Sequence, residues 1–240
     1  MMEKSGRIRM KLVVGAAVVG GFIVVMPMVA QGATFTQPAG LAAGSGYRLV
    51  FESAGNTQAT SSNVSSYNAF AKAQAGLNAL LPTATWTAII STATVSAVSN
   101  VDCPGCDDVP VFLVDGTEVA ASTTNLFNNT FLHGIIEDQS GSQQNSYAFT
   151  GSASNATAKP GNTAGSSFVE IGYSFNNSTL FDFSSGYPAT TLLSVYALSG
   201  ELFTPGVAVP EPASGALLAA GGAVVALLRR RKRTATTAVS

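Results

Sequence analysis

Short apolar stretches in the pattern of strands dominate the chain between residues 34 and 208. Apolar and polar positions alternate partly over 47–51, which predicts a short strand. Residues 86–101 are rich in β-branched side chains and predict one or two further strands. The remaining strand candidates are 109–114, 146–150, 167–175 and 192–198. We therefore expect β structure to dominate this part of the chain.

One segment, 66–81, has the spacing of an amphipathic helix. Ser65 or Ser66 can cap its start, and Pro82 ends it. The apolar positions that recur about every 3.6 residues are Tyr67, Phe70, Ala71, Leu77, Leu80 and Leu81. Further along, Asp115–Gly116 is a strong hairpin signal that leads into a returning strand at 117–120. Together these elements predict one α+β domain, dominated by β structure, over residues 34–208.

The first apolar run lies in residues 1–33 and follows four basic residues. The apolar stretch 12–25 is followed by Pro27 and by small residues at Ala30 and Ala33. This order of basic, apolar and small residues predicts a secretory signal peptide, cut after Ala30 or Ala33. The alternative is an uncleaved N-terminal membrane anchor. The basic residues are Lys4, Arg7, Arg9 and Lys11.

The last apolar run, 213–228, follows Pro210-Glu211-Pro212. Its sixteen uncharged residues would form a helix about 24 Å long, with the proline suited to its start. The cluster after it should remain cytoplasmic, because positive charges accumulate on that side of a membrane. A tail at 234–240 follows. The basic residues are Arg229, Arg230, Arg231, Lys232 and Arg233.

These three C-terminal parts, over 209–233, resemble the PEP-CTERM sorting domain of bacterial exported proteins. The resemblance implies that Pro210, Glu211 and Pro212 are recognised by an exosortase, a membrane enzyme thought to cut near this motif. It also implies that the basic cluster retains the helix in the membrane until processing. The tail 234–240 departs from the family, whose members usually end near the arginines. The alternative is an ordinary tail anchor in which the prolines are incidental.

The charges are unevenly distributed along the chain. The whole chain has a net charge of −1, yet residues 34–208 hold only three basic residues, Arg48, Lys72 and Lys159, against eleven acidic ones, a net of −8. Nucleic-acid binding needs a cluster of cations, so this composition argues against it. Only 10% of all residues are charged, and 24 are glycines. Together with the many hydroxyl and amide side chains, this indicates a protein that works outside the cell.

A looser resemblance covers about 80 residues of the body. It rests on four segments and the helix that follows the first of them. The segments are Tyr47-Arg48-Leu49-Val50-Phe51, Trp86-Thr87-Ala88-Ile89-Ile90-Ser91-Thr92-Ala93, the hairpin from Val109-Pro110 through Asp115-Gly116 to Ala120, and Asn125-Leu126-Phe127. In this order the segments are similar to the C-type-lectin-like or endostatin-like arrangement. That resemblance implies that 192–198 is a closing strand paired with the first. The Glu-Pro-Asn, Gln-Pro-Asp and Trp-Asn-Asp motifs of calcium-dependent sugar binding are missing from the sequence.

Cys103 and Cys106 are the only cysteines, and in an oxidising compartment they most simply form a small disulfide-closed loop. Free thiols, a redox pair and a metal site are the alternatives. The flanking Asp102, Asp107 and Asp108, with Asp115, could offer oxygen ligands to Ca²⁺. Their spacing matches no known calcium loop, so we interpret them as a solvated acidic turn and expect no cofactor.

Candidate catalytic residues are few. His133, the only histidine, lies in an apolar setting, and Glu137 and Asp138 are adjacent rather than opposed as the acids of a glycosidase are. No Gly-x-Ser-x-Gly nucleophile motif and no phosphate loop occur. We therefore expect a non-enzymatic, exported cell-surface or extracellular-matrix protein that passes through an inner-membrane intermediate. The alternatives are a carbohydrate-binding or adhesive lectin-like module with extracellular polysaccharide as its partner, and a secreted glycan hydrolase.

Overall fold

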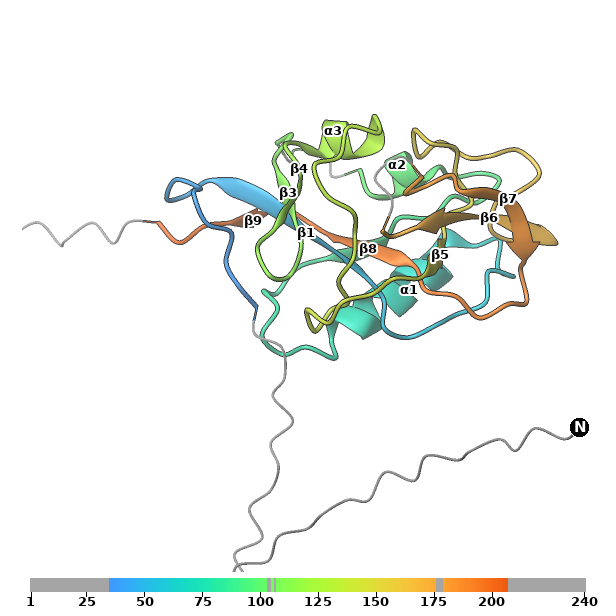
Figure 1. Cartoon of the computed structure of the whole chain (residues 1–240), viewed down its shortest axis with the longest axis horizontal. Helices are drawn as coiled ribbons and strands as arrows, with labels where there is room; N and C mark the ends of the chain where they lie inside the picture. The colour runs from blue at the N-terminus through green and yellow to red at the C-terminus, as the bar shows by residue number, and fades with distance from the viewer. Residues whose placement is uncertain (1–34, 103–104, 106, 176–178, 207–240) are drawn as a thin grey trace, which may run out of the picture. The chain divides into compact units, whose positions relative to one another are not determined.

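Strand β1 (Gly46–Glu52) lies at the centre of a six-stranded sheet. The computed structural model describes residues 35–102, 105, 107–175 and 179–206. The strands follow the order β2-β8-β1-β3-β4, and β9 pairs with the beginning of β1 (Figure 1). β1 is antiparallel to β8 and β9 and parallel to β3. The other strands are β2 (Trp86–Ala88), β3 (Val111–Phe112), β4 (Glu118–Ala120), β8 (Tyr196–Ser199) and β9 (Leu202–Phe203).

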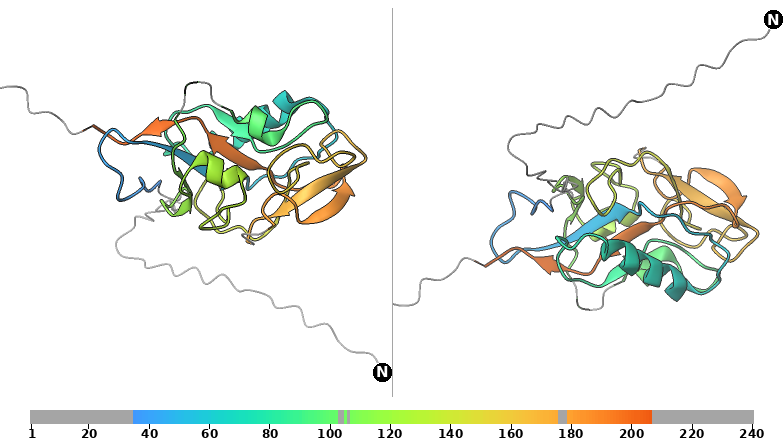
Figure 2. Two further views of the ribbon diagram at one scale, coloured as in Figure 1. Left: turned by 90° about the horizontal axis from the view of Figure 1, so that it is seen from above. Right: turned by 90° about the horizontal axis from the view of Figure 1, so that it is seen from below.

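Both faces of β1 are buried, because alternate side chains enter two hydrophobic clusters. Leu49 and Phe51 join the cluster that packs under α1, whereas Val50 joins the cluster that includes α2 and α3. Figures 1 and 2 show α1 and α3 on opposite sides of the sheet. Burying a large apolar side chain contributes about 1.5–3 kcal/mol, so this double burial anchors the fold on β1. The helices are α1 (Val64–Ala75), α2 (Ala97–Asn100) and α3 (Thr123–Phe127).

A second, antiparallel sheet has three strands in the order β5-β6-β7. The two sheets meet where the backbone N–H of Phe149 donates to the carbonyl of Ser194 at 2.9 Å. Gly172 in β6 allows the segment before β7 to approach closely, because a Cβ atom there would lie 1.7 Å from the carbonyl oxygen of Leu180. The strands are β5 (Tyr147–Phe149), β6 (Phe168–Tyr173) and β7 (Ser184–Pro188).

The predicted strands and hairpin are largely confirmed. β1 lies where alternation predicted a strand, β5 and β6 lie within the strand candidates 146–150 and 167–175, and β8 covers the second half of 192–198. β3 and β4 form the predicted hairpin around Asp115–Gly116. Gly116 has a φ of 89°, which favours glycine, and the Thr117 N–H donates to the Asp115 carboxylate at 2.7 Å.

The predicted helix 66–81 is correct in place but wrong at both ends. Asn63, rather than a serine, caps its start by accepting a hydrogen bond from the Ser65 N–H at 3.0 Å. The helix ends at Ala75, and turns follow. Leu77 and Leu80, expected in the core, are 69% and 55% exposed. Their apparent periodicity therefore continued past the true end of the helix.

The prediction of strand structure over 86–101 is right only for its first part. β2 ends at Ala88, and α2 forms near the other end of the range. Ser96 caps α2 by accepting a hydrogen bond from the Ser99 N–H at 3.2 Å. A single capped turn thus overrides the strand preference of the β-branched residues around it. Strands β7 and β9 and helix α3 were not expected as such.

The described body is a β-rich single domain with few helices. Within residues 35–206, apart from the short gaps, no helix has the length and apolar character to cross a membrane. The signal peptide predicted at 1–33 and the membrane helix predicted at 213–228 lie outside the described residues.

Candidate functional site

Four aromatic rings gather on the three-stranded sheet and form what we call the aromatic patch: Tyr147, Tyr173, Phe183 and Tyr187. Tyr147 and Tyr173 are direct partners across β5 and β6. The ring of Tyr147 is central, because its centroid lies 5.2 Å from Tyr173, 5.3 Å from Phe183 and 6.0 Å from Tyr187. The rings therefore hold one another in place, as tilted aromatic pairs do.

The aromatic patch is open to solvent at its rim. Phe183 is 40% exposed and Tyr187 36% exposed, while Tyr147 and Tyr173 are half-buried. The hydroxyl of Tyr173 donates to the Asn145 side-chain oxygen at 2.7 Å, which fixes that ring further. Chemically, the patch offers preorganised ring faces next to hydroxyl and amide groups. Exposed apolar groups of this kind often mark binding sites.

A buried carboxyl group is linked to the aromatic patch through hydrogen bonds near Tyr147. Glu52 is fully buried and accepts hydrogen bonds from the hydroxyls of Ser146 and Ser194. Ser146 precedes Tyr147 in the chain, and the Ser194 hydroxyl also contacts the Tyr147 carbonyl at 3.1 Å. Burial raises the pKa of Glu52, and the hydrogen bonds oppose that shift. The cluster therefore positions the strand that carries the central ring.

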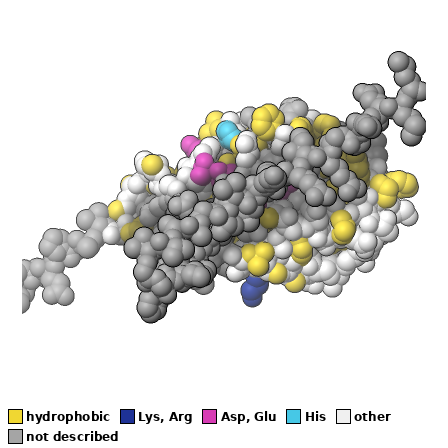
Figure 3. All heavy atoms as spheres, turned by 60° about the horizontal axis from the view of Figure 1, so that its bottom comes forward, with side chains coloured by type: hydrophobic (Ala, Val, Ile, Leu, Met, Phe, Trp, Pro, Cys, Tyr) yellow, Lys and Arg dark blue, Asp and Glu magenta, His cyan; other side chains and the backbone are white. Residues whose placement is uncertain are grey.

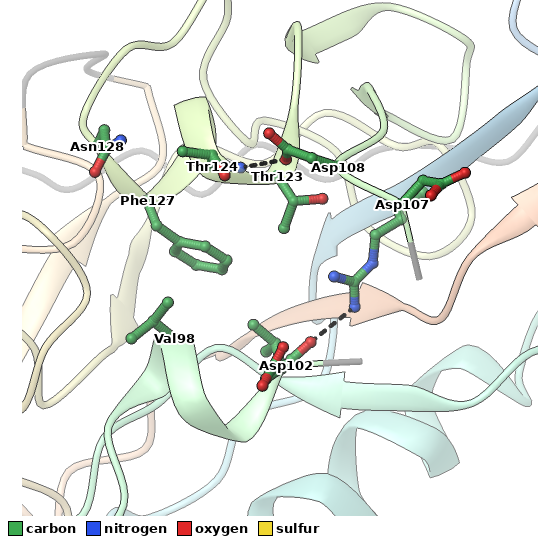
Figure 4. A pocket seen from close by; sticks show the side chains of 10 residues that line it. Val98, Asp102, Asp107, Asp108, Thr123, Thr124, Phe127 and Asn128 are labelled. Carbon is green, nitrogen blue, oxygen red and sulfur yellow. Dashed lines mark hydrogen bonds between the residues drawn. The ribbon is translucent and has the colours of Figure 1, made fainter. Parts of the chain in front are cut away.

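A separate pocket of about 280 Å³ lies at the opposite end of β1 from Glu52 and is lined by Arg48, Asp102, Asp108, Thr124 and Phe127, among others (Figure 4). Arg48 is buried, and its guanidinium donates to the carbonyls of Ser199 at 2.6 Å and Val101 at 3.1 Å. Burial lowers the pKa of Arg48 to about 10, against the attraction of Glu201 and Asp102. Arg48 thus remains charged at neutral pH but is already bound to the backbone.

The four acidic residues considered for calcium do not all gather at one site. Asp102, Asp107 and Asp108 line the pocket, whereas Asp115 lies beside Glu137. Asp108 accepts a hydrogen bond from the Thr124 N–H at 2.8 Å in the first turn of α3. Among the described residues no group of three or more His, Cys, Asp or Glu side chains is arranged to hold a metal ion.

The three basic side chains of the body have different surroundings. Arg48 is buried, Lys159 forms ion pairs with two acids, and Lys72 is exposed on α1. Figure 3 accordingly shows one small basic spot on a face of mostly uncharged side chains. Nothing on that face resembles the basic stripe of a nucleic-acid interface.

The candidate catalytic residues take part in local structure. The His133 ring nitrogen Nδ1 lies 3.0 Å from the Gly134 carbonyl oxygen. Glu137 accepts a hydrogen bond from the Asp115 N–H at 3.0 Å, and burial raises its pKa to about 7. Asp138 is also buried and accepts hydrogen bonds from the N–H groups of Ser140 at 2.7 Å and Ser142 at 3.0 Å, which hold a turn.

The C-terminal region supplies the decisive comparison. Residues 208–232 match the family of the PEP-CTERM protein-sorting motif. The chain carries a PEP-CTERM sorting motif. A search of curated proteins with the chain found no match. The PEP-CTERM motif marks an exported protein that is targeted to an exosortase and passes through the membrane to the cell surface.

The PEP-CTERM match confirms the resemblance on which the sorting prediction rests. It includes Pro210, Glu211 and Pro212 and extends through Lys232, one residue short of Arg233. These residues lie outside the described part of the structure, as do Cys103 and Cys106. The predicted disulfide between those two cysteines therefore stays a prediction.

The PEP-CTERM motif could be found from sequence, but the aromatic patch could not. Its rings come from β5, from β6, from the segment before β7 and from β7 itself. The only sequence signal was a pair of strand candidates, 146–150 and 167–175, that each carry a tyrosine. Their register across the sheet, which brings the tyrosines together, cannot be deduced from either strand alone.

Proposed function

We propose that the protein is a cell-surface or extracellular-matrix protein that an exosortase processes near Pro210-Glu211-Pro212. The PEP-CTERM match at residues 208–232 carries this proposal. The signal peptide at 1–33 would start export, and the basic cluster that begins at Arg229 would retain the C-terminal helix in the membrane until processing. The working body would then be the acidic domain over 34–208, released or transferred to the surface.

Removal of residues 209–240 tests the sorting step. We expect the truncated protein to lose its surface location and its processed form, as measured by cell fractionation and by the mass of the mature chain. Removal of 234–240 alone is the matched control, because that tail lies beyond the matched residues. If the longer truncation leaves location and mass pattern unchanged, the sorting proposal is wrong.

We further propose that the body acts by binding and is not an enzyme for an external substrate. Support comes from the local hydrogen bonds of Glu137, Asp138 and His133, each of which has a structural partner. A glycoside hydrolase would instead hold two carboxyl groups about 5 to 9.5 Å apart across a cleft. Release of reducing sugar from extracellular polysaccharides by the purified body would overturn this proposal.

The aromatic patch favours carbohydrate binding as the second candidate function. One face of a pyranose ring consists of C–H groups, which are attracted to the electron-rich faces of aromatic rings. The hydroxyl of Tyr173 and the amide of Asn145 add polar groups at the rim. The pairing of β1 with β8 is what the lectin-like scaffold requires of its closing strand, and so supports that scaffold.

A glycan array with neutral and acidic polysaccharides, in the presence and absence of Ca²⁺, tests this candidate. We expect binding of neutral glycans without a calcium requirement, and its loss in Phe183→Ala and Tyr187→Ala. Phe203→Ala is the matched control, because Phe203 is 63% exposed on β9, outside the patch. Equal loss in all three variants, or no binding by the wild type, would count against the patch as a glycan site.

A further inference from the structure

Three ionisable side chains meet at one place on the small sheet. Lys159 Nζ lies 2.7 Å from Asp182 Oδ1 and 2.9 Å from Glu170 Oε2. Glu170 also shares a hydrogen bond with Asp182. The three groups therefore form a closed triangle of amine and two carboxyls, which is more than an ion pair requires.

The three side chains differ in their exposure to solvent, and this difference suggests a separate role for the most buried one. The side chain of Glu170 is fully buried, whereas those of Lys159 and Asp182 are 27% and 30% exposed. One cation faces two carboxyls, so the site is neutral only if one carboxyl holds a proton. Burial raises the pKa of Glu170, which favours protonation of this group. A buried carboxyl group therefore contacts both an amine and a second carboxyl group.

We propose that Lys159 and Asp182 become joined by an intramolecular isopeptide bond, with Glu170 as the catalytic residue that transfers protons. The Lys159 ammonium loses a proton to the Asp182 carboxylate through Glu170. The neutral Nζ then forms a bond to Cγ of Asp182. Glu170 accepts a proton from the nitrogen and returns one to the departing hydroxyl, so the C–O bond breaks and one water leaves. Nothing is oxidised or reduced, and no co-reactant is needed.

An unfavourable proton-transfer equilibrium limits the rate, because bond formation needs the neutral amine. Burial disfavours the charged ammonium, but hydrogen bonds with Asp182 and Glu170 outweigh this and raise the pKa of Lys159. The amine is thus rarely neutral, and the reaction depends on the fixed geometry. Reacting groups held in contact gain effective concentrations of about 10⁵–10⁸ M, which compensates for a rare reactive form.

The backbone around the triangle is held firmly enough to keep that geometry. The Lys159 N–H donates to the Gly151 carbonyl at 3.1 Å, and the Glu170 N–H donates to the Asn162 carbonyl at 2.7 Å. On the other side, the Phe183 N–H donates to the Ile171 carbonyl at 2.8 Å, next to Asp182. Each reacting residue is therefore positioned by a hydrogen bond at or next to its own backbone.

The bond would join the segment between β5 and β6 to the segment between β6 and β7. A disulfide between the two cysteines would crosslink neither segment, because the cysteines are three positions apart and can close only a small loop between them. An amide crosslink also resists reducing agents, unlike a disulfide. Such a crosslink suits an exported domain that lacks the covalent support of distant cysteines.

Intact mass spectrometry of the denatured, reduced full chain tests the proposal. The expected wild-type mass is that of its polypeptide minus one water molecule. Lys159→Arg keeps the cation but lacks a nucleophilic amine, and Asp182→Ala lacks the carboxyl, so both should show the full mass. Glu170→Gln should fold and show the full mass, or at least a tenfold slower loss of water. The matched control Lys72→Arg should behave as the wild type.

Cleavage after glutamate locates the bond. Cuts at Glu137, Glu170 and Glu201 should give peptides 138–170 and 171–201 separately without a crosslink, but one branched species with it. A full-mass wild type, with circular dichroism showing a folded body, overturns the proposal and leaves an ion pair. So does a water loss that persists in Lys159→Arg, because it would arise elsewhere, for instance at Asp115–Gly116. The wild type should also melt several degrees above Lys159→Arg.

Discussion

The Glu137 carboxylate oxygen Oε2 accepts a hydrogen bond from the Asp115 backbone N–H at 3.0 Å, so two acidic residues lie together beside the β3–β4 hairpin. The Glu137 carbonyl in turn accepts a hydrogen bond from the Glu52 N–H at 2.8 Å. Asp138 lies near enough to raise the pKa of both glutamates. Burial and this repulsion together favour the protonated form of the two glutamates.

The stability of the body is expected to fall as the pH rises through the titration of Glu137. Glu137 titrates near pH 7 in the folded protein and near its ordinary value of 4.5 when unfolded. Between these values the native state binds more protons, so the free energy of unfolding decreases with increasing pH. The contribution lost by pH 8 is on the order of 2 kcal/mol. Urea unfolding at pH 5 and pH 8 measures it.

Glu137→Gln should flatten this dependence, because the amide oxygen can still accept the Asp115 hydrogen bond without titrating. A residual slope of the same sign should remain from Glu52, whose pKa is also raised. Glu118→Gln, half-buried on β4, is the matched control and should unfold with the wild-type pH dependence. A steeper slope in Glu137→Gln would contradict the assignment.

Arg48 is expected to stabilise the core through its two backbone hydrogen bonds. Arg48 uses two separate nitrogens for the carbonyls of Ser199 and Val101, and lysine has a single one, so Arg48→Lys should lower the free energy of unfolding by about 1–3 kcal/mol. Arg48→Met, which leaves both carbonyls unpaired, should be worse. Lys72→Met, on exposed α1 surface, should change stability by less than about 0.5 kcal/mol. Thermal and urea unfolding compare the three variants, and equal effects at both positions would contradict the role of Arg48.

Gly172 is expected to tolerate no side chain. The added Cβ would meet the Leu180 carbonyl oxygen at 1.7 Å, which is backbone and cannot rotate away. Gly172→Ala should therefore separate the segment before β7 from β6 and destabilise the body by more than about 3 kcal/mol. At Gly200 the nearest atom would be 3.8 Å from the added Cβ, so Gly200→Ala should melt close to the wild type. Scanning calorimetry of both variants separates these outcomes.

Sequence reasoning found elements whose signals are local and complete. Alternation located β1, and Asp115–Gly116 located the β3–β4 hairpin, because strand period and turn chemistry act over a few residues. The end of α1 was misplaced because Leu77 and Leu80 continue the helical spacing beyond the turn at Gly76. Two-residue strands such as β9 leave no period to detect, since their pairing partner alone defines them.

The sorting motif was found because it is contiguous, whereas the sites on the body are not. The triangle of Lys159, Glu170 and Asp182 joins three segments through the register of one small sheet. The tyrosines of the aromatic patch likewise meet across strands. Isolated residues in hydroxyl-rich segments gave no indication of such partners, because strand register depends on the packing of the whole domain.

Tyr147 should be the ring on which the aromatic patch depends, since it alone contacts the other three. Tyr147→Ala removes that support and is expected to weaken glycan binding at least tenfold, about 1.4 kcal/mol. Tyr147→Phe keeps the ring and should bind within about twofold of the wild type. Isothermal titration with the glycan selected on the array distinguishes them, and near-ultraviolet circular dichroism reports whether the tyrosines stay packed. If Tyr147→Phe loses as much affinity as Tyr147→Ala, the hydroxyl rather than the ring carries binding, and stacking on the patch is the wrong explanation.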